Sequence, residues 1–147
     1  MAATAASAIR IAFVEKLHAI RYPHGIVKHL IDGLAVATGG ALGALLRWLI
    51  ALTCGRFFGH EFPIGILVIN VSGSFFLGWF LTRGQWSNTM LLGTAVGFVG
   101  AYTTFSTLMF DTTALWDNGA FIRATINIVG SIVLGLIAVR LGIYCAR

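Results

Sequence analysis

Charged side chains are scarce in this sequence: Asp, Glu, Lys and Arg together make up only 10% of its 147 residues. A soluble domain carries about 25% charged residues, and a small domain needs them because most of its residues lie near the surface. Hydrophobic residues make up 58% of the chain, and the mean hydropathy is +0.89. The shortage of charge excludes a soluble monomer and predicts a small integral membrane protein.

Cysteine is nearly absent, which excludes two further classes of protein. Cys54 and Cys145 lie far apart and neither belongs to a CxxC pair, so the chain has neither a disulfide framework nor a zinc site. We interpret both as small apolar residues. The histidines are His18, His24, His29 and His60. Their spacing matches no metal site, and because no catalytic constellation is visible we expect a protein that is not an enzyme.

Acidic side chains are also few, and none lies well inside a long apolar stretch. The acids are Glu15, Asp32, Glu61, Asp111 and Asp117. Proton-coupled exporters usually need a membrane-buried Asp or Glu that can gain and lose a proton. The sequence therefore lacks a carboxylate relay, whereas a pore lined by neutral hydrogen-bond donors would not need one.

The basic residues are scattered along the chain rather than gathered into a stripe. The net charge of +5 therefore does not indicate a nucleic-acid partner. Four of the ten Lys and Arg residues precede the first long apolar stretch. Beyond them, the two sides of a four-span protein carry three and two basic residues, which is too even for the positive-inside rule to fix an orientation. This balance permits insertion in both orientations.

Four apolar stretches have the length of membrane-crossing helices. They cover residues 34–52, 64–81, 90–110 and about 122–139. A helix needs about 20 apolar residues to cross the hydrocarbon core, and these stretches do not alternate as barrel strands do. The second and third contain no charge, whereas the first contains Arg47 and the fourth begins near Arg123. We predict an all-α, multi-pass protein of the cell (inner) membrane, with four transmembrane helices per subunit.

The first 33 residues differ from the rest and form a basic leader before a four-helix transmembrane domain, residues 34–147. Residues 9–20 are weakly amphipathic, and Pro23 and Gly25 then interrupt the pattern. The leader fits a helix on the membrane surface or a disordered segment. Its content of Ala and basic residues also fits a targeting segment.

Small residues recur at helical spacing inside the predicted spans. Gly39 and Gly43 lie in the first span, and Gly93, Gly97 and Gly100 lie in the third. Such stripes let helices approach closely inside a bilayer. Because four short helices present so much small and polar surface, we also expect a partner subunit, and a homodimer is the smallest assembly that supplies one.

The third span contains a run of hydroxyl side chains, since residues 103–107 read Thr-Thr-Phe-Ser-Thr. Ser and Thr can hydrogen-bond to nearby backbone groups and replace lost helix bonds. One interpretation is a helix broken at membrane depth, which is tolerated where it is buried or lines a wet cavity. The other is a continuous helix in which the hydroxyls only pack. A break would offer carbonyls to a cation and N–H groups to an anion.

Three motifs in order resemble the Fluc (CrcB-type) fluoride channel family. The first span reads Gly-Gly-Ala-Leu-Gly-Ala-Leu-Leu-Arg and ends at Arg47. The second reads Pro-Ile-Gly-Ile-Leu-Val-Ile-Asn-Val-Ser-Gly-Ser-Phe, in which the Asn is Asn70. The third covers residues 97–107, and the fourth span adds Ser131 and Gly135. The resemblance covers the chain from about residue 33 onward.

The resemblance implies a passive, fluoride-selective channel that exports cytoplasmic fluoride through an antiparallel, dual-topology homodimer with two pores. It also implies that the third helix is broken mid-membrane. The implied pore residues are Asn70, Phe105, Ser106, Thr107, Leu108 and Ser131. Arg47 and Asp111 would lie at the vestibule, and the backbone carbonyls of Gly100 and Thr103 would hold one structural Na⁺ at the dimer interface.

Four positions depart from the pattern of that family. Leu108 stands where the family usually has a second pore phenylalanine, and Ala101 where it has a second glycine before the Thr-Thr pair. Asp111 stands where it usually has Glu, and Asn127 where the fourth span usually has Tyr. Two alternatives are a small four-helix multidrug exporter and a membrane subunit that transports nothing. The exporter would need a glutamate within the first span, which contains Arg47 instead, and a mere subunit would not need Asn70 together with the hydroxyl run.

Overall fold

The computed structural model describes residues 25–59 and 61–147. All regular structure in these residues is helical, and four helical stretches are long and apolar enough to cross a membrane. They are α2 (Ile26–Phe58), α3 (Ile64–Arg83), a composite third span (Asn88–Asp117) and α7 (Phe121–Cys145). Each predicted span falls inside one of these stretches. The prediction of an all-α, four-span, multi-pass membrane protein is confirmed.

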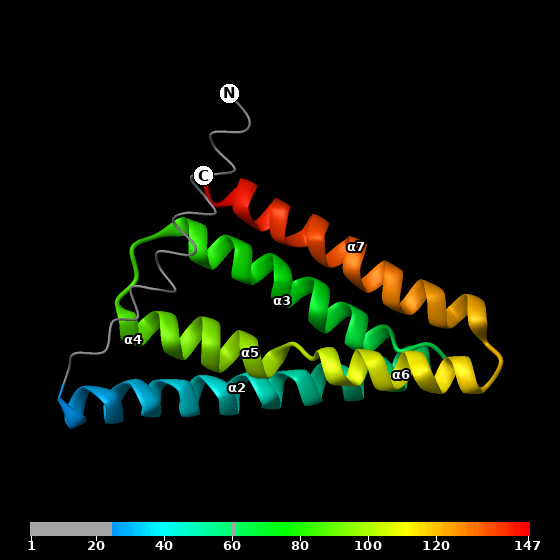
Figure 1. The fold of residues 1–147 in the computed structure, drawn as a ribbon, viewed down its shortest axis with the longest axis horizontal. Helices are drawn as coiled ribbons and strands as arrows, with labels where there is room; N and C mark the ends of the chain where they lie inside the picture. The colour runs from blue at the N-terminus through cyan, green and yellow to red at the C-terminus, as the bar shows by residue number, and fades with distance from the viewer. Residues whose placement is uncertain (1–24, 60) are drawn as a thin grey trace.

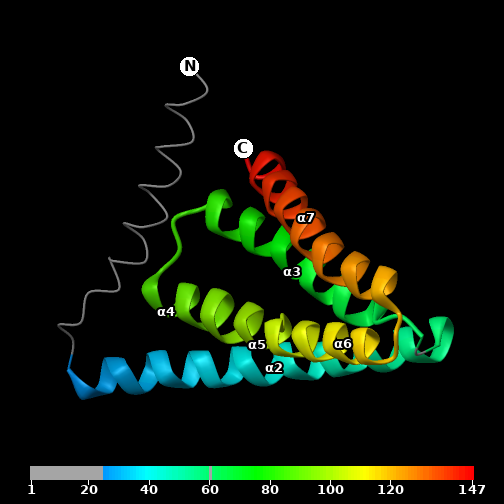
Figure 2. The same ribbon diagram turned by 45° about the vertical axis from the view of Figure 1, so that its right-hand side comes forward.

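The four spans pack as two pairs that are joined by the third span. In Figures 1 and 2, α2 runs alongside the third span, and α3 runs alongside α7. The first half of the third span packs against α2, whereas its last helix, α6, packs against α7. The third span thus changes neighbours partway along its length.

The third span consists of several helical segments. They are α4 (Asn88–Leu91), the π-helix η1 (Leu92–Val99), α5 (Gly100–Tyr102) and α6 (Phe105–Asp117). The side chain of Ser87 caps the start by accepting a hydrogen bond from the Met90 N–H at 3.3 Å. Between α5 and α6, Thr103 and Thr104 both have extended backbone, with ψ of 158° and 117°. The helix is therefore broken at the two threonines of the hydroxyl run.

Glycines allow α2 to touch the backbone of η1. A Cβ atom at Gly39 would collide with the carbonyl oxygen of Gly93, and one at Gly43 would collide with that of Phe98. A Cβ at Gly97 would lie 2.6 Å from the carbonyl oxygen of Val36. Because backbone atoms cannot turn aside as a side chain can, any larger residue would push the helices apart.

The pair formed by α3 and α7 is built in the same way. A Cβ at Gly78 would collide with the carbonyl oxygen of Val139, and one at Gly142 would collide with that of Phe75. These contacts fix α7 along the length of α3.

The first helix is longer than a bilayer requires. At about 1.5 Å per residue, the 33 residues of α2 span about 50 Å, whereas the hydrocarbon core is about 30 Å thick. Its first turns, which belong to the predicted leader, carry a polar cluster: Lys28 Nζ lies 3.0 Å from Asp32 Oδ1, and the Thr89 hydroxyl donates to the same oxygen at 2.5 Å. Lys28 also donates to Thr89. The predictions for residues 1–24 lie outside the described residues.

Candidate functional site

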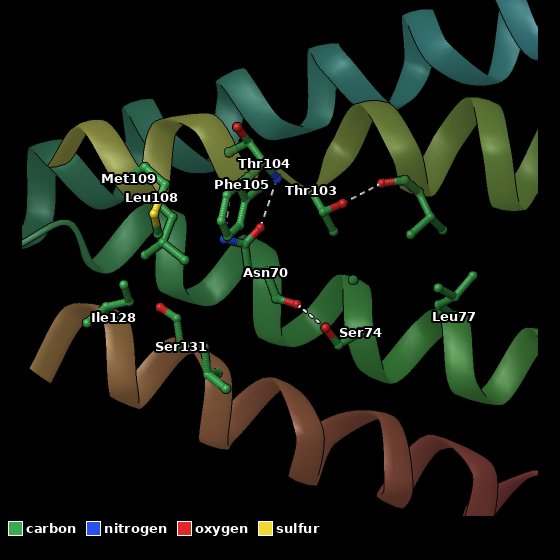
Figure 3. A pocket seen from close by; sticks show the side chains of 13 residues that line it. Asn70, Ser74, Leu77, Thr103, Thr104, Phe105, Leu108, Met109, Ile128 and Ser131 are labelled. Carbon is green, nitrogen blue, oxygen red and sulfur yellow. Dashed lines mark hydrogen bonds between the residues drawn. The ribbon is translucent and has the colours of Figure 1, made fainter. Parts of the chain in front are cut away.

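Asn70 on α3 closes the break in the third span. Its Nδ2 donates to the carbonyl oxygen of Thr104 at 3.1 Å, and its Oδ1 accepts from the Thr104 N–H at 2.9 Å (Figure 3). A side-chain amide carries the same donor and acceptor as a peptide group. It therefore satisfies the Thr104 N–H, which the break releases from the helix and which would be costly to bury unpaired. It also adds a second donor to the Thr104 carbonyl, which as the N-cap of α6 already accepts the first bond of that helix.

This pairing also leaves polar groups uncommitted at the break. In a continuous α-helix the Thr104 N–H would bond to the carbonyl of Gly100, four residues earlier, but here it bonds to Asn70. The Gly100 carbonyl therefore loses its helical donor. Asn70 keeps one of its two Nδ2 hydrogens, for which no partner is present among the described residues.

Thr104 is the centre of the hydroxyl run. Its Oγ1 accepts from the Thr107 N–H at 3.2 Å and caps the start of α6. The same oxygen lies 3.0 Å from Thr107 Oγ1 and 3.3 Å from Ser106 Oγ. The predicted pore residues Ser106 and Thr107 thus gather around Thr104, which the sequence analysis did not single out. Threonine is a preferred N-cap residue, and its place directly before the helix that begins at Phe105 is the signal that could have identified it.

The break opens onto a groove of about 400 Å³ between α3, the third span and α7. Four of the six predicted pore residues line it: Asn70, Phe105, Leu108 and Ser131. Figure 3 shows them coming from three different helices toward one space. Ser106 and Thr107 do not line the groove, whereas Thr103, Thr104 and Ser74 do.

Most hydroxyl side chains on the described helices donate a hydrogen bond to the backbone carbonyl one turn earlier, but Ser131 makes no such bond. Those that donate to the carbonyl one turn earlier are Thr38, Thr53, Ser72, Ser74, Thr103, Thr112, Thr113 and Thr125. Ser131 Oγ is buried and has no hydrogen-bond partner in the described part of the chain. In Figure 3 this oxygen points from α7 toward Leu108. Its O–H is therefore uncommitted among the described residues, in a residue that lines the groove.

Comparison with known proteins agrees with this architecture. Residues 34–143 match the family model described as CrcB-like protein, Camphor Resistance (CrcB). The chain belongs to the CrcB-like family. A relative from Synechococcus sp. (strain JA-2-3B'a(2-13)), named fluoride-specific ion channel FluC, is 42% identical over 117 residues, which are 77% of this chain and 90% of the relative.

Two further relatives with the same name have similar coverage. The protein of Shewanella sp. (strain W3-18-1) is 43% identical over 114 residues, 74% of this chain and 90% of its own length. That of Nitrobacter winogradskyi is 42% identical over 118 residues, 78% of this chain and 94% of its own length. The similarity thus covers at least nine-tenths of each of these three relatives.

The ring of Phe105 is uncovered in a single CrcB-like chain. It lies beside the Asn70 amide in Figure 3, yet 73% of its surface is exposed. Leu108, one helical turn later, is 5% exposed and packs in a core cluster with Ile66, Ile69 and Tyr102. One face of the groove is thus a rigid wall, whereas the face that carries Phe105 lacks a neighbour within the chain.

A second polar groove of about 460 Å³ lies where α6 ends and α7 begins. Asp111, Glu61 and Arg123 line it, and Arg123 Nη1 lies 3.1 Å from Glu61 Oε2. Arg47 lines neither this groove nor that of Asn70. The structure of one chain therefore does not bring together Arg47 and Asp111, the two residues predicted at the vestibule.

The predicted sodium ligands lie on either side of the last turn before the break. Gly100 begins α5 and is exposed, and Thr103 follows α5 with its side chain donating to the Val99 carbonyl at 3.0 Å. No group of three or more acidic, His or Cys side chains that could hold a metal occurs in the described ranges. Any cation at this place would meet neutral backbone oxygens.

Proposed function

We propose that this chain is a passive, fluoride-selective ion channel that exports fluoride from the cell. One observation carries the proposal: the uncommitted N–H of Asn70 and the uncommitted O–H of Ser131 meet in one groove that no charged side chain lines. The relatives named fluoride-specific ion channel FluC support the same conclusion. The protein conducts an ion and does not catalyse a reaction.

Neutral donors suit fluoride because it is small and strongly hydrated. Moving a bare ion out of water costs many kcal/mol unless other groups replace the lost hydrogen bonds. Amide N–H and hydroxyl groups donate such bonds, and the edge of an aromatic ring such as Phe105 is electropositive. A fixed Lys or Arg at the narrowest point would hold the ion too strongly, because conduction requires easy exit as well as entry.

The working unit is an antiparallel, dual-topology homodimer with two pores. This part of the proposal is supported by the uncovered ring of Phe105 and by a groove that is open along one side of the single chain. A second copy would complete the wall and exclude lipid. The even distribution of basic residues along the spans is compatible with chains that insert in both orientations.

The break in the third span lies at the middle of the bilayer. Thr103 and Thr104 are the sixteenth and seventeenth of the 30 residues from Asn88 to Asp117, so the break lies close to the middle of the span. At that depth, non-helical backbone is tolerated only when it is buried or lines a cavity. Asn70 and the groove meet both conditions.

A structural Na⁺ fits the groups at the break. The Gly100 carbonyl lacks the donor that a continuous helix would give it, and Thr103 ends the helical segment. Uncharged oxygens are ligands that a hard monovalent cation accepts, and helices broken in a membrane often offer them. The carbonyls of Gly100 and Thr103 from two chains would hold the ion, which would supply positive charge at the subunit contact.

Direction follows from the membrane potential and needs no energy source of its own. A negative cell interior drives an anion outward by about 2.3 kcal/mol per 100 mV. Fluoride enters cells as neutral HF from acid surroundings and dissociates inside, so a passive exit lowers the internal concentration. The exporter alternative is weaker because the groove is lined by no acid that could couple transport to protons.

The test is fluoride efflux from liposomes that contain only this protein, recorded with a fluoride-selective electrode and with chloride as the control anion. We expect rapid fluoride efflux, no chloride efflux and a strong reduction in Asn70→Asp, where a carboxylate replaces the donor. Asn88→Asp, the same change at the start of the third span and outside both grooves, is the matched control. Absence of fluoride efflux from wild-type protein would overturn the proposal.

A further inference from the structure

Two buried polar atoms lack a hydrogen-bond partner in the part of the chain that the structure describes, and both belong to α7. They are Asn127 Oδ1 and Ser131 Oγ. Residues four apart on a helix lie on the same face, one turn above the other. The two residues therefore lie on one face of α7. Ser131 lines the groove, and Asn127 lies one turn earlier against Thr112 of α6.

Asn127 cannot satisfy its amide with the protein alone. The residue is completely buried, and its Nδ2 donates to Thr112 Oγ1 at 2.8 Å. The Thr112 hydroxyl itself donates to the Leu108 carbonyl at 2.7 Å. Because one hydroxyl can face only one end of the amide, the other end of Asn127 keeps no partner whichever way the amide is turned.

We propose that a resident water molecule is bound between Asn127 and Ser131 and that Asn127 thereby orients the Ser131 hydroxyl. Buried waters typically satisfy polar groups that the protein leaves unpaired. This water donates one hydrogen to Asn127 Oδ1 and the other to Ser131 Oγ. A bare anion does not fit the same place, because a carbonyl oxygen repels it.

The direction of the second bond is part of the proposal. A water that donates to both Asn127 Oδ1 and Ser131 Oγ makes Ser131 the acceptor, so its own O–H points elsewhere, whereas a water that accepted from Ser131 would leave no O–H for the groove. The groove is the open direction, because Ser131 lines it. Donors in such a chain polarise one another, so the water also strengthens the bond that Ser131 offers. Asn127 is thus a positioning residue, an inference that rests on the proposed channel function.

A double-mutant cycle tests this role. Fluoride efflux is measured for wild type, Asn127→Leu, Ser131→Ala and the double variant, with Thr125→Val on the exposed face of α7 as control. We expect each single variant to slow efflux about fivefold, in line with one lost hydrogen bond. The double variant should be no slower than Ser131→Ala. The inference would be overturned if the double variant were slowed by the product of the two single effects, or if Asn127→Leu conducted fluoride at the wild-type rate.

A more conservative substitution tests the same role if Asn127→Leu does not fold. Thr112→Val keeps the shape of the residue and removes only the oxygen that holds Asn127. We expect it to slow efflux when Ser131 is present and to have no effect beside Ser131→Ala. Equal slowing in both backgrounds contradicts a role that acts through Ser131.

The water itself gives a readout that is independent of conduction. A high-resolution crystal structure should contain a water between Asn127 Oδ1 and Ser131 Oγ, and that water should be absent from Asn127→Leu. An empty or protein-filled space would overturn the inference while leaving the channel intact. Conversely, a wild-type protein that contains this water but passes no fluoride would overturn only the proposed function.

Discussion

The amide of Asn70 lies against the backbone of Thr104 and joins α3 to the broken third span through hydrogen bonds of 3.1 and 2.9 Å. One side chain thus holds the break in shape and keeps a hydrogen for a ligand. In the proposed channel, structure and transport are therefore coupled at this residue. Substitutions of Asn70 should lower both the stability of the fold and the rate of fluoride efflux. Substitutions elsewhere in the groove should change one of these quantities without the other.

Asn70→Ala should destabilise the fold as well as stop conduction. It leaves the Thr104 N–H without a partner, and one unpaired buried group costs about 1–3 kcal/mol. We expect a clearly lower melting temperature of the purified protein in detergent together with loss of fluoride efflux. A variant that loses efflux but melts like wild type would mean that Asn70 does not support the break.

Thr104→Val should weaken the start of α6 without changing the shape of the side chain. Loss of a threonine cap costs about 1 kcal/mol, and the hydroxyls of Ser106 and Thr107 also lose their common neighbour. Thermal melting should show this loss. Thr104→Ser, which retains the hydroxyl, is the control and should melt within a few degrees of wild type.

Phe105→Ile should slow fluoride efflux markedly while the protein remains folded. The ring is 73% exposed in one chain, so little packing within the subunit is lost, but the electropositive aromatic edge disappears. Phe110→Ile provides the matched control, because Phe110 is 74% exposed on the same helix and does not line the groove. Equal rates in wild type and Phe105→Ile would exclude the ring from the ion route.

Gly43→Ala should disrupt the contact between α2 and η1. The added Cβ would collide with the carbonyl oxygen of Phe98, which cannot move without shifting the helix. Gly40→Ala is the control, because the nearest atom to its added Cβ is 3.9 Å away. We expect low yield or a low melting temperature for Gly43→Ala alone, measured by size-exclusion chromatography and thermal melting. Equal tolerance of both changes would contradict the close backbone contact.

Removal of sodium should weaken the proposed dimer. Carbonyls that face each other without a cation repel, so replacing Na⁺ by N-methylglucamine should shift the purified protein from dimer toward monomer. Cross-linking followed by gel electrophoresis measures this shift. If the dimer population is identical in both salts, the carbonyls of Gly100 and Thr103 do not hold a structural ion.

The sequence predicted the fold well because membrane spans depend mainly on local composition. Hydropathy placed all four helices, and the glycine stripes indicated close helix contacts that the structure contains at Gly39 and Gly43. The first turns of α2 were assigned to the leader instead, since Lys28 and Asp32 interrupt the apolar pattern. Their charges are satisfied by each other and by Thr89, which lies far along the chain.

The candidate site was predictable in its residue types but not in its connections. The hydroxyl run left a broken and a continuous helix both open, because the partner of Thr104 is Asn70, thirty-four residues earlier. Likewise, nothing local distinguishes Ser131 from Ser74, which donates to the carbonyl of Asn70. Such differences depend on which helix lies opposite, and hydropathy does not encode that choice.

The surplus length of α2 has a consequence for the surroundings of the channel. About 20 Å of helix remain beyond a hydrocarbon core of about 30 Å, and the clasp of Lys28, Asp32 and Thr89 stiffens one end of that surplus. In an antiparallel pair, each leaflet would contact the N-terminal end of α2 from one chain, with its Lys28–Asp32–Thr89 cluster, and the C-terminal end of α2 from the other chain. The lipid headgroups on both faces of the membrane would then touch the same protein surface.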